Sequence, residues 1–116
     1  MINDNTSLPI FVYNIPGRAV VNILPETLAK MAELSHICGI KDATGDLARP
    51  WKERALIKRK DFTWLSGEDA TQVSYNVAGG VGCISVTANI APRLLLKFKA
   101  YAPKTSGSRH VSFRIN

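Results

Sequence analysis

The nine residues Ile37–Gly45 read ICGIKDATG, an apolar run that is broken by Lys41 immediately before a turn. A short apolar run that ends at a turn signal is typical of a buried strand. Lysines rarely occupy such positions, because burying an ammonium group without a partner is costly. Lys41 is therefore the first candidate functional residue, and the segments around it decide which fold could hold an amine at the end of a strand.

Strand-like and helix-like segments alternate along the chain. Four short apolar runs are predicted to be strands, at Leu8–Tyr13, Ile37–Lys41, Phe62–Ser66 and Gly82–Val86. Helical patterns follow them at Leu24–Leu34, from Asp46 to about Lys60, from Asp69 to the Gly79-Gly80 pair, and from near Asn89 with Leu94, Leu95 and Phe98 on one side. Asp46 and Asp69 are each expected to cap the helix that they precede. Four strand–helix units predict an α/β fold with a parallel sheet.

The length of the chain limits how such a sheet can be completed. A parallel sheet must be covered on both faces or closed into a barrel. A (β/α)8 barrel takes about 250 residues, and this chain has 116. Four strands leave two edges with unpaired backbone groups and an apolar face without cover. These constraints predict a partial (β/α)8 TIM barrel of four βα units.

Charge and composition disfavour several classes of protein. With 46% hydrophobic and 21% charged residues, the chain is typical of one compact domain rather than a disordered segment. Its net charge of +6 comes from six basic residues between Arg93 and Arg114, whereas a nucleic-acid surface usually spreads its basic residues over one face of the fold. No apolar stretch reaches the roughly 18 residues that cross a bilayer, and the N-terminus lacks a signal-peptide pattern. Cys38 and Cys83 form no CxxC motif and are expected to be reduced, buried thiols of a cytoplasmic protein, with a disulfide as the alternative.

Lys41 falls at the carboxyl end of its strand, where barrel enzymes assemble their active sites. Because side chains alternate across a strand, Lys41 is expected to share one face with Ile37 and Gly39, while Cys38 and Ile40 share the other. Gly39 is expected to leave room at the centre of the barrel. Burial in such a place lowers the pKa of a lysine, and a neutral amine can attack a carbonyl to form a Schiff base. The alternative is a lysine that extends into solvent from the strand end.

The ends of the other strands carry groups that fit this chemistry. Tyr13 ends the first strand in VYNIPGR, next to a tight Pro16-Gly17 turn and the guanidinium of Arg18. A tyrosine can pass protons near a Schiff base, and an arginine can hold a carboxylate through two hydrogen bonds. The third and fourth runs end in LSGEDA and GCISVTANI, with small or polar residues after the apolar run. The alternative for these residues is ordinary turn chemistry and helix capping.

Together, four segments of the chain strongly resemble the dihydrodipicolinate synthase (4-hydroxy-tetrahydrodipicolinate synthase) family, the Schiff-base-forming barrels of lysine biosynthesis. The segments are LPIFVYNIPGR, GIKDATGDLARPWKERA, LSGEDA and GGVGCISVTANIAPR, in the family's order and at its spacings. The resemblance runs from about residue 2 to residue 100 and corresponds to the second half of the family's barrel. It places a half-barrel in residues 1–101 and leaves residues 102–116 as a basic, loosely ordered tail, in which Val111–Ile115 could form a short strand.

The resemblance implies a role for each candidate residue. Lys41 would form an imine with pyruvate, and Tyr13 would donate and accept protons beside it. Arg18 would hold a carboxylate at the entrance, the backbone carbonyl of Ile84 would face the substrate, and Gly67 would line the site. The implied activity is that of a class I lyase condensing pyruvate with aspartate semialdehyde in lysine (diaminopimelate) biosynthesis, and Arg18 favours this activity over related sugar-acid lyases. No metal or organic cofactor is implied, because the lysine imine itself serves as the electron sink.

The family fold is a full barrel, usually assembled as a homotetramer. By this resemblance the chain is expected to lack the first four strands, which carry the threonines of the proton relay and a neighbouring subunit's tyrosine, and to lack the C-terminal helices. With one side open, water reaches Lys41, so little or no activity is expected of the chain alone. The half-barrel is expected to pair with itself or with a complementing half-barrel chain. The alternatives are a non-catalytic fragment that docks on full-length relatives and a nucleic-acid binder that uses the basic tail.

Overall fold

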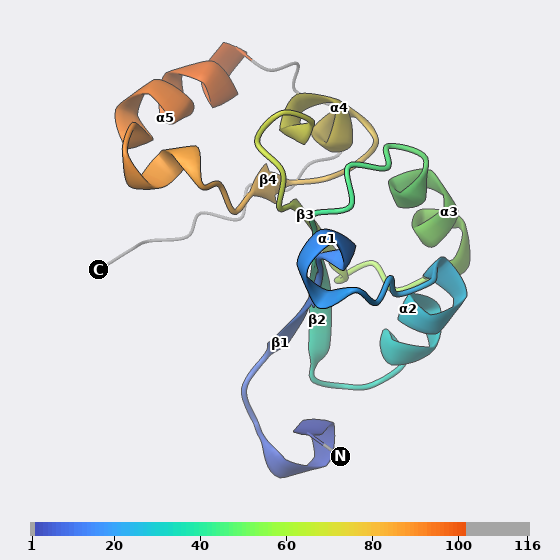
Figure 1. Cartoon of the computed structure of the whole chain (residues 1–116). Helices are drawn as coiled ribbons and strands as arrows, with labels where there is room; N and C mark the ends of the chain where they lie inside the picture. The colour runs from blue at the N-terminus through green and yellow to red at the C-terminus, as the bar shows by residue number, and fades with distance from the viewer. Residues whose placement is uncertain (1, 102–116) are drawn as a thin grey trace.

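The structure, a computed structural model, describes residues 2–101, with side chains described as far as Lys97. Its elements in chain order (Figure 1) are η1 (Ile2–Asn5), β1 (Ile10–Asn14), α1 (Pro16–Ala19), α2 (Pro25–Met31), β2 (Ile37–Asp42), α3 (Arg49–Leu56), β3 (Thr63–Ser66), α4 (Gln72–Val77), β4 (Gly82–Cys83), η2 (Thr87–Asn89) and α5 (Pro92–Tyr101). The predicted tail, residues 102–116, and the strand considered at Val111–Ile115 lie outside the described residues. No helix within residues 2–101 is both long and apolar enough to span a membrane. Cys38 and Cys83 are free thiols, as expected, but both are half-buried, so the prediction that they are buried is wrong.

The four strands form one parallel sheet in the order β1-β2-β3-β4, which confirms the predicted α/β fold (Figure 1). Helices α2, α3 and α4 connect successive strands, as parallel pairing requires. The register places Tyr13 of β1 opposite Lys41 of β2, and Lys41 opposite Leu65 of β3. The carboxyl ends of the first three strands therefore lie side by side.

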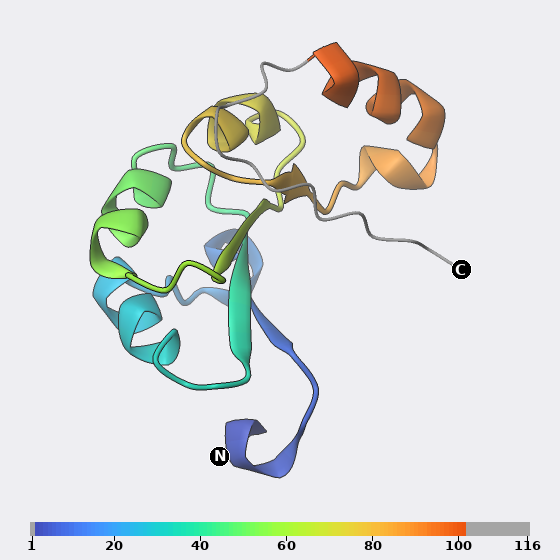
Figure 2. The same ribbon diagram turned by 180° about the vertical axis from the view of Figure 1, so that it is seen from behind.

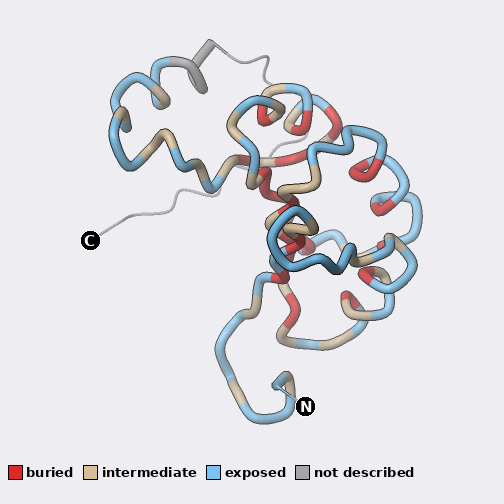
Figure 3. Tube along the Cα trace, viewed as in Figure 1, coloured by how far each residue is buried: buried red, intermediate tan, exposed pale blue. Residues whose placement is uncertain are grey.

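Helices α2, α3 and α4 lie in a row along one side of the sheet, which Figure 2 shows from behind. The apolar residues buried in this layer are Val12, Leu28, Ala32, Ile37, Ile40, Ile57, Phe62, Trp64 and Tyr75. Buried positions gather along the strands and the inner sides of these helices (Figure 3). The opposite face of the sheet is exposed at β1, where Phe11 and Tyr13 are 37% and 46% exposed, whereas Leu65 of β3, opposite Lys41, is buried. This open face carries none of the three connecting helices, and a parallel sheet with helices on one face only has the form of half a barrel wall.

The alternation predicted along β2 holds only from Gly39 onward. The pairing of β1 with β2 shifts its register just before Phe11, which lies opposite Gly39. Ile37 therefore packs into the helix-side core, and the prediction that it shares a face with Lys41 is wrong. Gly39 leaves no empty space either, because Cε1 of the Phe11 ring lies 2.5 Å from where a Cβ atom on this glycine would be.

The two aspartates that were expected to cap helices bind other partners. Helix α3 has no side-chain cap, because Asp46 Oδ1 accepts a hydrogen bond at 2.9 Å from the amide of Ala48, before the helix begins. Helix α4 also has no side-chain cap, and the Asp69 carboxylate binds the amide and hydroxyl of Thr87, beyond β4. In both places donors outside the helix take the carboxylate, so the predicted caps are wrong.

Helix α3 ends at Leu56, earlier than the expected end near Lys60. Ile57 adopts an extended conformation, and the chain turns so that Arg59 reaches the segment between α2 and β2. The Arg59 guanidinium donates hydrogen bonds of 2.9, 3.1 and 2.9 Å to the backbone carbonyls of Ala32, Leu34 and Ile37. These contacts satisfy carbonyls at the end of α2 and join two successive βα units.

The last predicted elements are shorter than expected. Strand β4 covers Gly82–Cys83 instead of Gly82–Val86, and the separate 3-10 turn η2 delays the start of the final helix to Pro92. Of the apolar side predicted for this helix, Leu94 is exposed and Leu95 is half-buried, and the side chain of Phe98 lies outside the described part.

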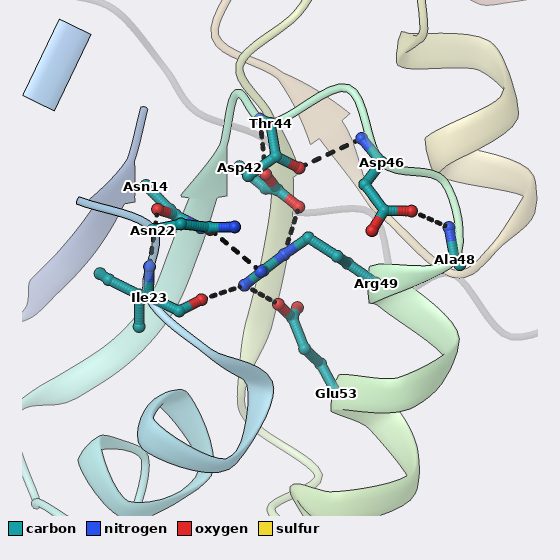
Figure 4. A network of polar contacts seen from close by, with 9 residues as sticks. All are labelled: Asn14, Asn22, Ile23, Asp42, Thr44, Asp46, Ala48, Arg49 and Glu53. Atoms are coloured by element: carbon teal, nitrogen blue, oxygen red, sulfur yellow. Dashed lines mark hydrogen bonds and ion pairs between the residues drawn. The ribbon is translucent and has the colours of Figure 1, made fainter. Parts of the chain in front are cut away.

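A buried group of charged residues joins α3 to the end of β2 (Figure 4). Arg49 Nε lies 3.6 Å from Asp42 Oδ2, and Arg49 Nη2 donates a hydrogen bond of 2.8 Å to Glu53 Oε1. The same guanidinium donates to the side chain of Asn22 at 3.2 Å and to the carbonyl of Ile23 at 2.7 Å. The three charged side chains are at most 4% exposed. Removing one partner of such a group typically costs about 3–5 kcal/mol, because a charge is left buried alone.

Glu53 is the member of this group whose ionisation is most affected. Burial raises the pKa of the Glu53 carboxyl to about 7, although the positive charge of Arg49 acts in the opposite direction. The neighbouring charge of Asp42 raises this pKa further, and the indole of Trp64 in β3 lowers it. Tyr75 of α4 faces the same group, and its phenol has a raised pKa because it is buried near these carboxylates. Glu53 therefore exchanges a proton close to neutral pH.

We expect the Glu53 carboxyl to make the free energy of unfolding fall as pH rises from about 4.5 to about 7. Its pKa is 4.5 in an ordinary setting and about 7 in the fold, so between these values the folded state holds a proton that the unfolded chain has released. At about 1.4 kcal/mol per pKa unit, the contribution lost across this window is about 3 kcal/mol. Urea unfolding at pH 5 and pH 7.5 measures it.

The variant Glu53→Gln should flatten this pH dependence, because the amide keeps the shape of the side chain and does not titrate in the window. The exposed Glu33 provides a matched control, and Glu33→Gln should keep the pH dependence of the original chain. Equal pH dependence in the original chain and in Glu53→Gln would contradict the assignment to Glu53.

Candidate active site

Lys41 and Tyr13 meet on the open face of the sheet. They are direct neighbours in the β1–β2 pairing, and the Lys41 ammonium Nζ lies 4.0 Å from the centre of the Tyr13 ring. A cation at this distance from an aromatic face is attracted by the ring's electrons. Both side chains point away from the helices, since Val12 and Ile40, which precede them in the strands, are in the helix-side core. The structure thus brings together the two principal residues predicted from the sequence.

Gly67, directly after β3, lies against the stem of Lys41. A Cβ atom on Gly67 would come within 3.0 Å of Lys41 Cε and 3.0 Å of the Ala43 Cβ. The Gly67 amide also donates a hydrogen bond of 2.6 Å to the carbonyl of Asp42, which holds the end of β3 against the end of β2. The absence of a side chain at Gly67 therefore sets the path that the lysine follows.

Ile84 stands in the loop after β4, next to the same strand ends. Its amide donates a hydrogen bond of 2.8 Å to the carbonyl of Ser66, and its side chain is exposed. The structure therefore places Ile84 beside Ser66 at the end of β3, and Ser66 directly precedes Gly67. That its carbonyl faces a substrate stays a prediction.

Asp69 fixes the loop that carries Ile84. Its carboxylate accepts hydrogen bonds from the Thr87 amide at 2.9 Å and the Thr87 hydroxyl at 2.7 Å, and the Cys83 thiol lies at 3.8 Å. Hydrogen bonding to Ser85 and then to Thr87 lowers the pKa of the Asp69 carboxyl to about 2. One ionised carboxylate thus holds residues on both sides of Ile84.

Arg18 lies in the single-turn helix α1, four residues after the end of β1 at Asn14. The tight turn forms because Pro16 occupies the first helical position and the Val20 amide closes on the Pro16 carbonyl at 2.9 Å. The Arg18 side chain is exposed, and within residues 2–101 its guanidinium has no hydrogen-bond or ion-pair partner. It is therefore available to an anion, although the structure does not bring it into contact with Lys41.

Two residues that support the site, Asp69 and Arg49, were not identified from the sequence. A signal for Asp69 was the alternating hydroxyls Ser85 and Thr87 at the end of the next strand, which could bind an acid at the neighbouring strand end. A signal for Arg49 was Glu53 four residues later, a spacing that brings two helical side chains together. Both are local spacings, and neither reveals how deeply the side chains are buried.

The arrangement provides an amine and a phenol side by side at an open sheet face. An amine can attack a carbonyl carbon, and a phenol can transfer the protons that such an addition requires. Among the residues that the structure describes, no group of three or more His, Cys, Asp or Glu side chains is placed to hold a metal ion.

Known proteins match this chain over the segments that carry the candidate site. The Dihydrodipicolinate synthetase family matches residues 1–108, beyond the end expected near residue 100. The 4-hydroxy-tetrahydrodipicolinate synthase of Roseobacter denitrificans is 58% identical over 99 residues, covering 85% of this chain and 34% of the relative. That of Chelativorans sp. is 51% identical over 114 residues, covering 97% of this chain and 39% of the relative. The chain therefore spans about a third of the length of these relatives.

Solved structures agree with the sheet described above. The dihydrodipicolinate synthase of Thermotoga maritima superposes with a TM-score of 0.79 at 42% identity, over 85% of this chain and 35% of the other. The chloride-inhibited enzyme of Acinetobacter baumannii, complexed with pyruvate, superposes with a TM-score of 0.80 at 39% identity, over 87% of this chain and 34% of the other. These neighbours are (β/α)8 barrels, and the four βα units match part of their wall. By sequence and by fold, the chain belongs to the dihydrodipicolinate synthetase family.

Proposed function

We propose that this chain carries the Schiff-base wall of a lyase that condenses pyruvate with aspartate semialdehyde in lysine biosynthesis. Lys41 is the nucleophile, and Tyr13 is the proton donor and acceptor beside it. Arg18 binds a substrate carboxylate, the backbone carbonyl of Ile84 faces the substrate, and Gly67 lines the site. The family membership supports the reaction class, and the juxtaposition of Lys41 with Tyr13 supports the assignment of roles.

One observation carries the proposal: the Lys41 Nζ lies 4.0 Å from the centre of the Tyr13 ring, on the face that does not pack against helices. In the proposed reaction the neutral amine attacks the keto carbon of pyruvate, and the carbinolamine loses water to give the imine. A base then takes a proton from the methyl group, the electrons of that C–H bond move toward the imine nitrogen, and the resulting enamine attacks the aldehyde of the second substrate. Each of these steps moves protons, and we assign their transfer to the phenol of Tyr13.

The open face limits what the chain does alone. Tyr13 is 46% exposed, so water reaches the region in which an imine would form. A lysine attacks a carbonyl only in its neutral form, and contact with water favours the charged form. A further factor of about 10²–10⁴ is expected to be lost where a proton relay is missing. We therefore propose that the chain needs additional strands over this face for substantial activity.

The proposed nucleophile can be tested by reductive trapping. We expect the chain with pyruvate and borohydride at pH 7.5 to gain little mass, because water reaches the face beside Tyr13 on which the imine would form. After addition of a chain that corresponds to the first half of the Roseobacter denitrificans relative, intact mass should show one pyruvate adduct per chain, and peptide mapping should place it on Lys41.

Two controls make this trapping decisive. The variant Lys41→Arg should lose the adduct, and Lys30→Arg, which changes an exposed lysine on α2, should keep it. Efficient trapping without the second chain would show that the open face does not limit the amine. An adduct on another lysine, or none in a stable complex of the two chains, would contradict the role of Lys41.

The same open face supports a proposal about assembly. Phe11 is 37% exposed on this face, and β1 and β4 are both edge strands of the sheet. Exposed edges and apolar faces favour association with further strands. We propose that the chain pairs through this face, with a complementing half-barrel when one is present and with a second copy otherwise.

We expect the purified chain alone to sediment as a discrete dimer at micromolar concentration. The variant Phe11→Gln should raise its dissociation constant at least about tenfold, which corresponds to the loss of about 1.4 kcal/mol. Trp51→Gln is the matched control, because Trp51 is 61% exposed on the outer side of α3, and it should leave the dimer unchanged. A monomer at all concentrations, or equal weakening by both variants, would contradict pairing through the open face.

A further inference from the structure

The site residues have a row of buried polar neighbours on the other side of the sheet. Asn14, Asp42 and Ser66 lie opposite one another across β1, β2 and β3. They are 1%, 3% and 0% exposed. Asn14 directly follows Tyr13, and Asp42 directly follows Lys41 in the sequence. Because consecutive side chains of a strand point to opposite faces, whatever fixes Asn14 and Asp42 on the helix side also fixes the peptides that carry Tyr13 and Lys41.

Arg49 connects two of these neighbours from the helix side (Figure 4). Its Nε faces Asp42 Oδ2 at 3.6 Å, which ties it to the end of β2. Its Nη1 donates at 3.2 Å to Asn22 Oδ1, and the same oxygen accepts a hydrogen bond of 3.0 Å from Asn14 Nδ2 at the end of β1. A single guanidinium thereby joins the ends of both strands.

The connection to β1 is made twice. Arg49 Nη2 donates at 2.7 Å to the carbonyl of Ile23, and the Ile23 amide donates at 3.2 Å to Asn14 Oδ1. Both paths run through the segment after α1 and end on the same amide side chain. Glu53, one turn along α3, accepts from the same Nη2 at 2.8 Å and holds the guanidinium in this orientation.

We propose that Arg49, acting through Asn22, is a positioning residue that holds Lys41 against Tyr13; the catalytic meaning of this contact rests on the proposed function. Arginine suits the task because its planar guanidinium donates in several fixed directions at once. A lysine at this position keeps the charge but donates from a single atom. The network lies wholly behind the sheet, so it affects the site through the backbone of two strands.

The proposal is tested without substrate, through the contact between the two side chains. Because the Lys41 Nζ lies 4.0 Å from the centre of the Tyr13 ring, we expect the ring to shift the NMR signals of the neighbouring Lys41 Hε protons upfield. In isotopically labelled full-length chain, Tyr13→Leu defines the position of these signals without the ring. We expect Asn22→Ala to reduce the upfield shift without abolishing it, because one of the two hydrogen-bonded paths between Arg49 and Asn14 is lost and the path through Ile23 remains.

Asn22 is exposed, so its replacement should leave the fold intact, which the amide spectrum of the core residues verifies. Asn89→Ala, which changes another exposed asparagine far from the network, should leave the Lys41 signals unchanged. Arg49→Lys is the second variant, and it should retain the fold with a shift between those of the original chain and Tyr13→Leu.

Unchanged Lys41 signals in a folded Asn22→Ala chain, with only a lower free energy of unfolding, would overturn the proposal and leave the network a purely structural role. A failed pyruvate trapping together with a reduced upfield shift would instead contradict the proposed function and leave the positioning inference standing.

Discussion

A parallel sheet has two apolar faces to cover, and this constraint governs the structure. Helices α2, α3 and α4 bury one face through residues such as Ile40 and Trp64. The other face carries an amine, a phenol and the ring of Phe11 at the surface. In a closed barrel that face becomes the interior, where these groups would be surrounded by the remaining strands. Lys41 is an unusual residue for the face of an isolated sheet, but it is a reasonable one for a face that lines the interior of a closed barrel.

The charged group behind the sheet follows from the same layering. Charges in a layer between helices and sheet are tolerated when they are paired and hydrogen-bonded. Arg49 and Asp42 form an ion pair at 3.6 Å, and each has a hydrogen bond elsewhere, Arg49 to Glu53 and the Asp42 carboxylate from the Thr44 amide. Burial raises the pKa of Glu53 to about 7, and the neighbouring negative charge of Asp42 raises this pKa further. The network thus joins α3 to two strand ends, and below about pH 7 a proton on Glu53 leaves Asp42 as the carboxylate that balances Arg49.

Sequence patterns predicted most of what depends on local periodicity. The four strands and their parallel sheet follow from alternation and βα spacing, and they are confirmed. The structure also brings Lys41 to Tyr13, and their roles stay a prediction. The failures have a different cause. Ile37 lies on the helix side instead of the predicted face because the register between β1 and β2 shifts by one residue. The alternation of residues along a single strand does not reveal such a shift. Asp69 binds Thr87 rather than a helix end, and Thr87 is 18 residues away in the sequence. Two of the partners that surround Arg49, Asn22 and Ile23, are likewise distant in sequence, so no local pattern reveals its burial.

Positioning and enclosure of the candidate site are separate requirements, and the described strands meet only the first. Register sets Lys41 opposite Tyr13, Gly67 shapes the path of the lysine, and Asp69 fixes the neighbouring loop, all through contacts inside this chain. None of these contacts removes water from the open face, where Tyr13 stays 46% exposed. Under the proposed function, low activity of the chain alone would then reflect access of water to this face rather than disorder of the site. A second wall would need to bring cover and a proton relay, because the contact between the Lys41 amine and the Tyr13 ring is already formed.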